Sequence, residues 1–349
     1  MSLTSAAQDA YAVRNITWET TETWDIGLDA TFFNNRLSVT ADYYNKRTKD
    51  MLLALEIPKF LGYDNPSVNA GKMHTSGFDL QINWNDQISD FKYSIGFNLS
   101  DFKSKMGDLN GTEFLGDQIK KQGSEYNQWY GYESDGLFLT QDDLNNSPKL
   151  NNNIKVGDVK YKDISGPDGV PDGKISPEYD RILLKGSLPH LTFGLNFNAQ
   201  YKGFDFGMVL QGVGNQWARI NSTMVEGLSA NWCNFPELIK NKYWSEKNTD
   251  TQNAAARYPR LTRNNVSANL CMSDFWLFNG RYLRMKNLTL GYTLPTELTQ
   301  KASIKTLRLY VSGNDLFCLS KFPKGWDPEV GSASYPITKS VVFGLSVNF

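Results

Sequence analysis

The sequence predicts an all-β protein, an antiparallel transmembrane β-barrel with long extracellular loops. Two observations lead to this fold class. Apolar and polar side chains alternate with period 2 wherever the sequence is regular, which indicates strands with one apolar and one polar face. The connections between these strands are either very short or very long, and short turns at one end with long loops at the other are typical of outer-membrane barrels.

A first hairpin is predicted at residues 24–43. In segment 24–32 the apolar side chains of Trp24 to Phe32 alternate with polar or small residues such as Asp25 and Asp29. After the turn Asn34-Asn35 the alternation resumes over 37–43. Two alternating runs joined by such a turn predict an antiparallel pair.

The same alternation continues through the chain, in segments 78–84, 91–99, 191–201, 204–210, 288–294, 307–311 and 341–349. With the less regular segments 130–138 and 181–186 we expect roughly ten to eleven strands. Many have about 9 to 11 residues, the length that a tilted membrane-crossing strand needs. No segment has the 18 or more consecutive apolar residues of a transmembrane helix.

The connections fall into two classes. The short ones lie at 34–35, 85–90, 202–203 and 295–303, and the long polar ones at 57–73, 106–128, 140–180, 221–274 and 320–338. Loops of that length are unusual in a compact soluble domain. We therefore treat residues 1–349 as one domain that is a barrel wall with loops.

Composition excludes one class of partner and separates two β architectures. The 349 residues include 36 basic and 37 acidic side chains, so the charge excess that nucleic-acid binding needs is missing. A soluble sandwich also alternates, but its outer face is usually rich in Lys and Glu. Here the polar faces carry mainly Asn, Gln, Ser, Thr, Gly and Asp, and large aromatics lie near strand ends, as in the interface girdles of membrane barrels.

Motifs along most of the chain resemble those of one known family. In the C-terminal third they are RYLRMKNLTLGYTLP at 281–295, LRLYVSGNDLF at 307–317 and WDPEV at 326–330. Earlier in the chain they are WETT at 18–21, NNRL at 34–37, DYY at 42–44, GFDL at 77–80 and YGYESDGLF at 130–138. Together, and in this order, they resemble the SusC/RagA family of TonB-linked (TonB-dependent) outer-membrane transporters. The final strand, which ends on the aromatic Phe349, is similar to the signal that barrel-assembly machinery reads.

The resemblance implies that the chain is the C-terminal part of a receptor barrel of about 22 strands. On this interpretation the chain carries no plug domain, TonB box or signal peptide. A half-barrel has two open edges whose backbone groups cannot face lipid. We therefore expect a second segment to complete it, rather than closure into a smaller barrel.

The resemblance also implies a function. A complete transporter would import glycan or peptide fragments across the outer membrane, with a SusD-like surface lipoprotein as a lid and TonB as the energy source. No bond would be made or broken, and the protein would be a multi-pass barrel embedded in outer-membrane lipid. The lumen would be lined by polar side chains, among them Asp29, Asp42, Asp79, Asn83, Asn196, Asn198 and Gln200.

One loop has a pattern that suggests calcium. Segment 158–180 carries spaced carboxylates and Asp-Gly pairs, similar to an EF-hand loop, because calcium prefers six to eight oxygen ligands. The segment departs from that pattern, since residues 166–170 interrupt it and Asp180 falls one position late. The candidate ligands are Asp163, Ser165, Asp168, Asp172 and Asp180. The alternative is a polar loop in which Asp and Gly serve turn geometry.

The sequence contains no recognisable catalytic constellation, and no cofactor is required. The remaining functional candidates are loop aromatics that would stack on sugars or grip peptides, or would instead pack between loops. They are Trp129, Tyr130, Tyr132, Trp217, Trp232, Trp244 and Trp326. An alternative to the transporter is a secreted, calcium-stabilised β-sandwich that binds carbohydrate through these rings. Dependence on detergent separates the two.

Overall fold

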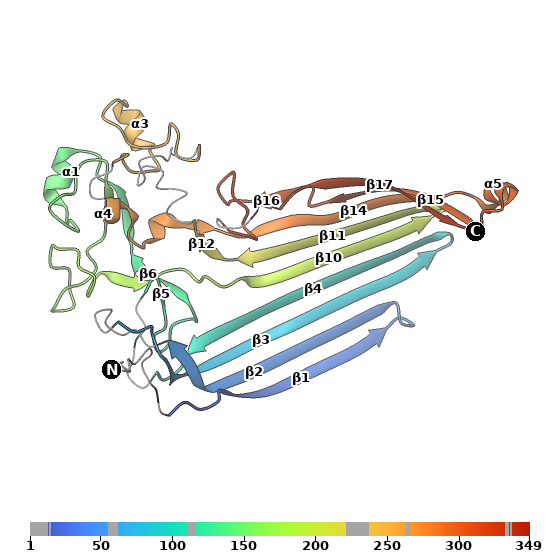
Figure 1. Ribbon diagram of the computed structural model, residues 1–349, viewed down its shortest axis with the longest axis horizontal. Coiled ribbons are helices and arrows are strands. Elements are labelled where there is room, and N and C mark those ends of the chain that lie inside the picture. The colour runs from blue at the N-terminus through green and yellow to red at the C-terminus, as the bar shows by residue number, and fades with distance from the viewer. Residues whose placement is uncertain are drawn as a thin grey trace, which may run out of the picture.

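A single ten-stranded antiparallel sheet dominates the molecule (Figure 1). The computed structural model describes residues 13, 15–54, 62–109, 113, 116–220, 237–262, 266–331, 335 and 337–349. The sheet forms a wall in which strands follow one another in space as in the chain: β1 (Thr20–Phe32), β2 (Leu37–Ala54), β3 (Ser67–Ile88), β4 (Phe91–Met106), β10 (His190–Tyr201), β11 (Phe204–Asn215), β14 (Tyr282–Thr293), β15 (Thr306–Asn314) and β17 (Ser340–Asn348). The short β16 (Cys318–Ser320) also pairs with β14. This confirms the predicted all-β antiparallel fold class.

The strand register places most of the apolar side chains of the wall on one face. Leu28 lies opposite Ala41, Ala41 opposite Leu80, and Leu80 opposite Leu99, which in turn faces Phe193. The same face continues across the later strands, where Phe204 lies opposite Tyr292, Tyr292 opposite Leu309, and Leu309 opposite Leu345. Because side chains alternate between faces, the intervening residues form an equally continuous polar face. A one-residue slip at any pair would reverse this arrangement.

No second sheet covers the apolar face in the part of the chain that the structure describes. Ile26 is 67% exposed, Leu28 61% and Phe343 82%. A sandwich would bury such residues against a facing sheet about 10 Å away, and a soluble monomer seldom exposes an apolar surface of this extent. The architecture therefore does not support the β-sandwich alternative.

The short connections lie at one end of the wall and the long ones at the other (Figure 1). At the β1–β2 turn, Asn34 and Asn35 take positive φ angles of 56° and 64°. At the β10–β11 turn, Lys202 and Gly203 do the same, with φ of 44° and 84°. These are the left-handed conformations that tight hairpins require. The predicted turns at 34–35 and 202–203 are thus confirmed.

Two sequence predictions need correction. Segments 130–138 and 181–186 do not form wall strands, but contribute β6 (Gln128–Tyr132), β7 (Ser134–Leu137) and β9 (Arg181–Leu183) to small sheets beyond the wall. The predicted loop at 57–73 is also partly strand, because β3 begins at Ser67. β2 and β3 have 18 and 22 residues. These lengths exceed the roughly 9–11 residues that cross a bilayer, so both strands continue past it at the loop end.

The long connections fold together into what we call the loop layer, residues 107–189, 216–281 and 316–339 as far as they are described. It contains β5 (Gln118–Ile119), β8 (Val159–Tyr161), β12 (Trp217–Arg219), β13 (Leu277–Asn279), α1 (Gln141–Asn146), α3 (Asp250–Ala254), α4 (Val266–Leu270) and η2 (Asp274–Trp276). Between β14 and β15, at the opposite end, lie α5 (Thr296–Thr299) and η3 (Gln300–Ala302). None of the helices in the described residues has the length and apolar character to cross a bilayer.

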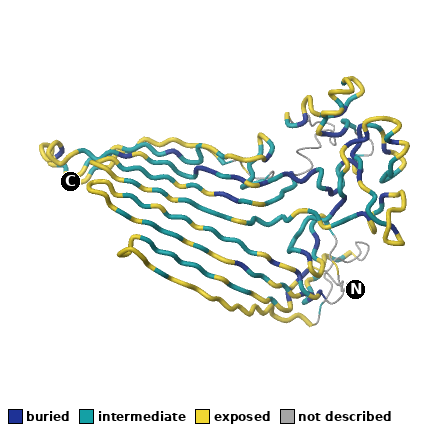
Figure 2. The backbone as a smooth tube through the Cα atoms, turned by 180° about the vertical axis from the view of Figure 1, so that it is seen from behind, coloured by how far each residue is buried: buried dark blue, intermediate teal, exposed yellow. Residues whose placement is uncertain are grey.

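Most of the buried residues lie in or next to the loop layer. Figure 2 shows that the wall strands alternate between intermediate and exposed residues, whereas buried stretches gather at the loop end. One apolar cluster joins Ile220, Tyr258, Trp276 and Phe278, and another joins Tyr132, Val159 and Trp244. The loop layer therefore has hydrophobic cores of its own. A further cluster, of Met51, Leu53, Ala70, Met106 and Leu109, lies at the loop-side ends of β2, β3 and β4. Elsewhere the wall has no such cluster in the described residues, because a single sheet layer cannot bury a face.

Candidate functional site

The polar face of the wall is a continuous surface of amides, hydroxyls and carboxylates. Asp29 accepts a hydrogen bond from Thr40 Oγ1 at 2.7 Å, Asp79 accepts one from Ser100, and Asn198 Nδ2 donates to Ser94 Oγ at 3.4 Å. These contacts run between neighbouring strands, as cross-strand pairing dictates. All seven lumen residues predicted from the sequence lie on this face, since the register alternates strictly from Asp29 to Gln200.

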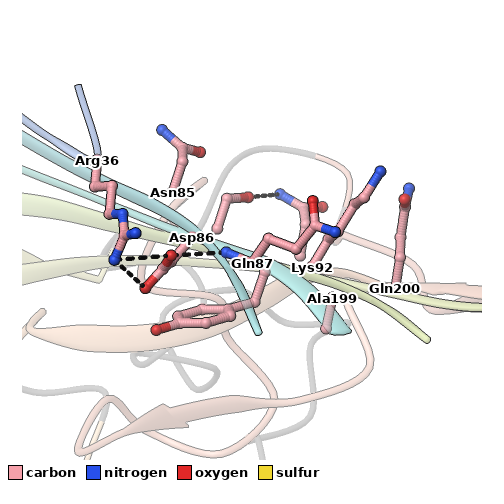
Figure 3. Close-up of a pocket in the computed structure, with 10 residues that line it drawn as sticks. Arg36, Asn85, Asp86, Gln87, Lys92, Ala199 and Gln200 are labelled. Carbon is pink, nitrogen blue, oxygen red and sulfur yellow. Dashed lines mark hydrogen bonds and ion pairs between the residues drawn. The ribbon is translucent and has the colours of Figure 1, made fainter. Parts of the chain in front are cut away.

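A cavity of about 570 Å³ lies near the short-turn end of the wall, lined by residues from both faces (Figure 3). Asn198 and Gln200 of β10 line it together with Arg36, Asp86 and Lys92. Asp86 lies 3.4 Å from the Arg36 guanidinium, in an ion pair that is exposed on the arginine side. The cavity offers hydrogen-bond donors and acceptors and side chains of both charges, which suit the binding of polar groups.

A second ion pair spans three strands of the wall. Arg308 of β15 reaches Asp205 of β11 with Nε–Oδ1 and Nη2–Oδ2 distances of 2.8 and 2.6 Å. β14 lies between them. Its Gly291 leaves space for the ion pair, because a Cβ at this position would clash with an Asp205 carboxylate oxygen. The bidentate geometry makes this a strong, directional pair.

The predicted calcium loop uses its carboxylates mainly to hold its own backbone. Asp180 is fully buried and accepts hydrogen bonds from the main-chain N–H of Ile164, Ser165 and Ser176 at 2.7, 3.2 and 2.7 Å. This is the turn-geometry role that the sequence left as the alternative. Asp168 lies in an exposed turn closed by the Gly169 N–H to Gly166 carbonyl bond of 2.9 Å.

Two of the predicted ligands, Asp163 and Asp172, each contact a glycine of this loop. Asp163 Oδ2 accepts the Gly173 N–H at 2.6 Å, while its Oδ1 is buried without a hydrogen-bond partner. Asp172 packs against Gly166, where an added Cβ would lie 2.8 Å from the Asp172 Cβ. Within the described ranges no group of three or more His, Cys, Asp or Glu side chains is placed to hold a metal ion. The calcium ligand set therefore stays a prediction.

The loop aromatics divide into packed and partly open rings. Tyr132 and Trp244 are buried in one loop-layer cluster, which is the packing role that the sequence left open. Trp129 Nε1 donates to the Trp217 carbonyl at 2.8 Å, and Arg181 lies over the Tyr130 ring at 4.5 Å. Trp326 is half-buried and lines a cavity. Trp232 lies outside the described residues.

Sequence reasoning missed a charge cluster that fastens the last long loop to the wall. Arg284 of β14 is almost fully buried, and its Nη2 lies 2.6 Å from Asp327 while its Nε lies 2.9 Å from Glu329. Lys286 pairs with the same Glu329 at 2.8 Å and with Asp315 at 3.4 Å. The matching i, i+2 spacing of Arg284/Lys286 and Asp327/Glu329 is the signal that would have paired them.

It also missed a histidine bridge at the loop end of the wall. His190, the first residue of β10, has Nδ1 2.7 Å from Asp101 Oδ1 and Nε2 2.6 Å from Glu125 Oε1. Since ionised carboxylates only accept hydrogen bonds, this arrangement requires both ring nitrogens to carry protons. The bridge ties loop residue Glu125 to two wall strands. No local sequence pattern announces it, because the three residues are far apart in the chain.

A buried ion pair joins two long connections of the loop layer. Asp158 is fully buried, and its Oδ1 lies 2.7 Å from Arg260 Nε and 2.9 Å from Asn269 Nδ2. Asn269 in turn accepts the main-chain N–H of Val159 at 2.8 Å. Every oxygen of the carboxylate is therefore bonded, as a buried charge requires.

Comparison with known proteins agrees with this architecture. Residues 2–316 match the family model described as TonB dependent receptor-like, beta-barrel. TonB-dependent receptor P3 of Formosa agariphila is 29% identical, over 97% of this chain and 35% of its own length. TonB-dependent receptor SusC of Bacteroides thetaiotaomicron is 27% identical, over 96% of this chain and 32% of its own.

Solved structures share the fold. The RagAB peptide transporter superposes with a TM-score of 0.75 at 24% identity, covering 95% of this chain and 35% of the matched chain. The RagAB peptide importer in its open-open state gives 0.74, over 98% and 36%. The chain thus spans about a third of the length of the proteins it matches. With the open wall, its two opposite faces and the family match over most of its length, the chain belongs to the TonB-dependent receptor-like β-barrel family.

Proposed function

We propose that the chain forms the C-terminal wall of an outer-membrane transporter that imports glycan or peptide fragments with energy from TonB. The apolar face contacts lipid, the polar face lines the lumen, and the loop layer stands over the extracellular mouth. A SusD-like surface lipoprotein covers that mouth as a lid. The chain acts on its cargo by binding and passage alone, without covalent chemistry.

The observation that carries this proposal is the separation of polarity between the two faces of one sheet. In water, a wall with its Ile26, Leu28 and Leu345 side chains largely exposed would be unstable and would associate. In a bilayer the same residues are solvated by lipid, and the strands bond to one another so that backbone groups are satisfied. Short turns at one end and a loop layer at the other match the orientation of bacterial barrels.

The relatives support the nature of the cargo at the level of class. One of them is named SusC, and the similar solved structures are titled as a peptide transporter and a peptide importer. All of these proteins are named as receptors, transporters or importers. Both cargo classes are extended polar chains, which suit a polar wall rich in hydrogen-bonding groups.

The test is uptake by cells in which the protein is made with and without TonB. We expect the protein to fractionate with outer membranes, to migrate differently on gels with and without heating, and to support uptake that is lost when TonB is deleted. A tagged protein should also retain a surface lipoprotein after mild detergent extraction. A protein that is monodisperse and β-rich in plain buffer would contradict the proposal and favour a soluble binding module.

We further propose that loop 158–180 holds one calcium ion through Asp163 and Asp172, with Ser165 and main-chain oxygens completing the shell. The buried, unbonded Oδ1 of Asp163 supports this, since calcium coordinates several oxygens at about 2.3–2.6 Å. Terbium luminescence sensitised by loop tyrosines should appear in the natural protein and be lost in Asp163→Asn. Equal luminescence in the natural protein and in Asp163→Asn would contradict the calcium site, and the carboxylates would then serve only to hold the turns of this loop.

A further inference from the structure

A second cavity, of about 750 Å³, lies within the loop layer. Four chain segments line it, and its size falls within the range of about 300–1,000 Å³ that small-molecule sites occupy. Its floor is formed by Tyr258 and Phe278, which are buried in one apolar cluster. Trp326 lines one side of the cavity. None of the residues that the family resemblance singled out, apart from Trp326, belongs to this cavity.

The excess of positive charge around the cavity indicates that it binds an anionic ligand. Lys242, Arg257, Lys321 and Lys324 line it, and Glu237 is the one carboxylate among its described lining residues. All four cations are exposed, and none lies within 4 Å of a carboxylate in the described part of the chain. The whole chain has a net charge of −1, so this concentration of positive charge is local. Clefts lined by one sign of charge attract ligands of the opposite sign.

The cavity is held in shape without a ligand. The Tyr258 ring packs against Trp276 at 6.1 Å, and the Phe278 ring against Phe322 at 6.2 Å. Asp327, next to Trp326, is held by Arg284 at 2.6 Å, so the loop that carries Trp326 and Lys324 is fastened to the wall. A site whose walls are fixed beforehand loses little conformational entropy when it binds.

From these contacts we infer that the cavity binds an acidic oligosaccharide, one that carries carboxylate or sulfate groups. Lysine and arginine bind such groups through charge-assisted hydrogen bonds, and the flat face of Trp326 accommodates the apolar face of a sugar ring. Basic clusters also recognise acidic peptides, so the feature that favours a sugar is the Trp326 ring beside the cations. This inference rests on the proposed import function, since it names the class of glycan that the loop layer meets first.

The test is calorimetric titration of the natural protein, purified in detergent from outer membranes. The probes are a tetramer of galacturonic acid, its carboxyl-reduced neutral counterpart, a sulfated galactan tetramer and a tetraglutamate peptide. We expect at least one acidic sugar to bind about tenfold or more tightly than the neutral tetramer, with affinity falling as salt rises because exposed charges are screened. Equal affinity for the acidic tetramer and its neutral counterpart, or tighter binding of tetraglutamate, would overturn the inference.

Two variants locate the site. Lys242→Gln/Arg257→Gln/Lys324→Gln should weaken binding of the acidic sugar about tenfold, since each exposed charge contributes modestly. Lys174→Gln removes an exposed lysine elsewhere in the loop layer and should leave the affinity within about twofold. Heat-modifiable migration of both variants checks that they are folded. Unchanged affinity in the triple variant would place the sugar elsewhere and contradict the assignment.

Failure of this inference is distinguishable from failure of the proposed function. TonB-dependent uptake of a neutral glycan or a peptide, without binding of either acidic sugar, would overturn the acidic-sugar inference and leave the proposed transport function intact. Loss of TonB-dependent uptake for every cargo would remove the transporter, whatever the cavity binds. Added lipopolysaccharide that displaces the acidic sugar would show that the cations instead serve membrane phosphates, and this too would overturn the inference.

Discussion

Individual side chains decide where the long loops attach to the wall. Arg284 and Lys286 project from β14 toward the polar side and meet Asp315, Asp327 and Glu329. A β-bulge opposite Val209 and Leu210 places the extra residue Lys286 in this strand, and bulges commonly redirect a side chain in this way. Residues 321–331 are thus held both by these ion pairs and by the packing of Phe322 and Trp326 against the apolar cluster of Tyr258 and Phe278.

Arg284→Met should release this loop. Removing one partner from a buried ion cluster costs about 3–5 kcal/mol, because the carboxylates keep their burial and lose their counter-charge. We expect faster hydrogen exchange over 321–331 while the barrel stays heat-modifiable. Arg36→Ala is the matched control, since its pair with Asp86 is more than half exposed on the arginine side and is worth at most about 1 kcal/mol. Equal protection of the loop in both variants would contradict the role of Arg284.

Cys271 is a second residue whose environment predicts a measurable property. Burial raises the pKa of its thiol to about 11, from an ordinary value of 9.0. Near neutral pH the thiolate is therefore about a hundredfold rarer than for an exposed cysteine, and only the thiolate reacts with maleimides. With Cys233 and Cys318 replaced by Ser, labelling should be slow at pH 7.5 and rise about tenfold per pH unit. Labelling as fast as in the urea-unfolded chain would show that Cys271 is not buried.

At the scale of elements, part of the structure follows from local sequence and part does not. The turns at 34–35 and 202–203 could be predicted because Asn and Gly tolerate positive φ between two alternating runs. Segment 130–138 alternates like a wall strand, yet its β6 part pairs with β5 and β9 in the loop layer. Alternating apolar and polar residues predict a strand with one apolar face, but they do not predict which strand or loop packs against that face. The ends of β2 and β3 were missed for the same reason.

The candidate sites show the same limit. The polar wall residues, from Asp29 to Gln200, could be assigned to one face because strand periodicity alone determines the face. The ion cluster around Arg284 and the His190 bridge join residues that are 29 to 89 positions apart, and the basic cavity draws its lining from segments between 237 and 326. The arrangement of the long loops brings such groups together, and only the ion cluster leaves a local signal, the shared i, i+2 spacing of Arg284/Lys286 and Asp327/Glu329.

The loop that contains Asp180 should depend on this residue with or without calcium. Asp180→Ala removes the acceptor for three main-chain N–H groups, and each buried donor left unbonded costs about 1–3 kcal/mol. We expect faster hydrogen exchange at Ile164, Ser165 and Ser176, both with added calcium and with a chelator. Protection restored fully by calcium would instead make the ion, and not Asp180, the organising group of this loop.

At the scale of the whole molecule, the wall is stable only where its two faces meet different solvents. Each face is continuous across all the strands from β1 to β17, and these two outer strands do not pair with each other in the described residues. Their unpaired backbone groups need partners in a membrane. The loop layer is different, because it contains apolar clusters and buried ion pairs like those of a soluble domain.

A charge should therefore be tolerated on one face of β3 and not on the adjacent position. Leu80→Arg places a cation on the lipid face and should destabilise the barrel by about 2–4 kcal/mol. Gln81→Arg places it on the polar face, where Gln81 is exposed, and should change stability by less than about 1 kcal/mol. Urea titrations in lipid vesicles measure both. Equal destabilisation would mean that the two faces share one environment.

The most direct test of the account is a spin-label scan along β10 in lipid vesicles. Cysteine-attached labels at consecutive positions from Thr192 to Gln200 report collisions with oxygen, which concentrates in lipid, and with a water-soluble nickel complex. We predict a period of two, with labels at Phe193, Leu195 and Phe197 favouring oxygen and labels at Asn196, Asn198 and Gln200 favouring nickel. Collision rates without this alternation, or nickel access on both faces, would contradict the assignment of this sheet as the wall of a membrane transporter.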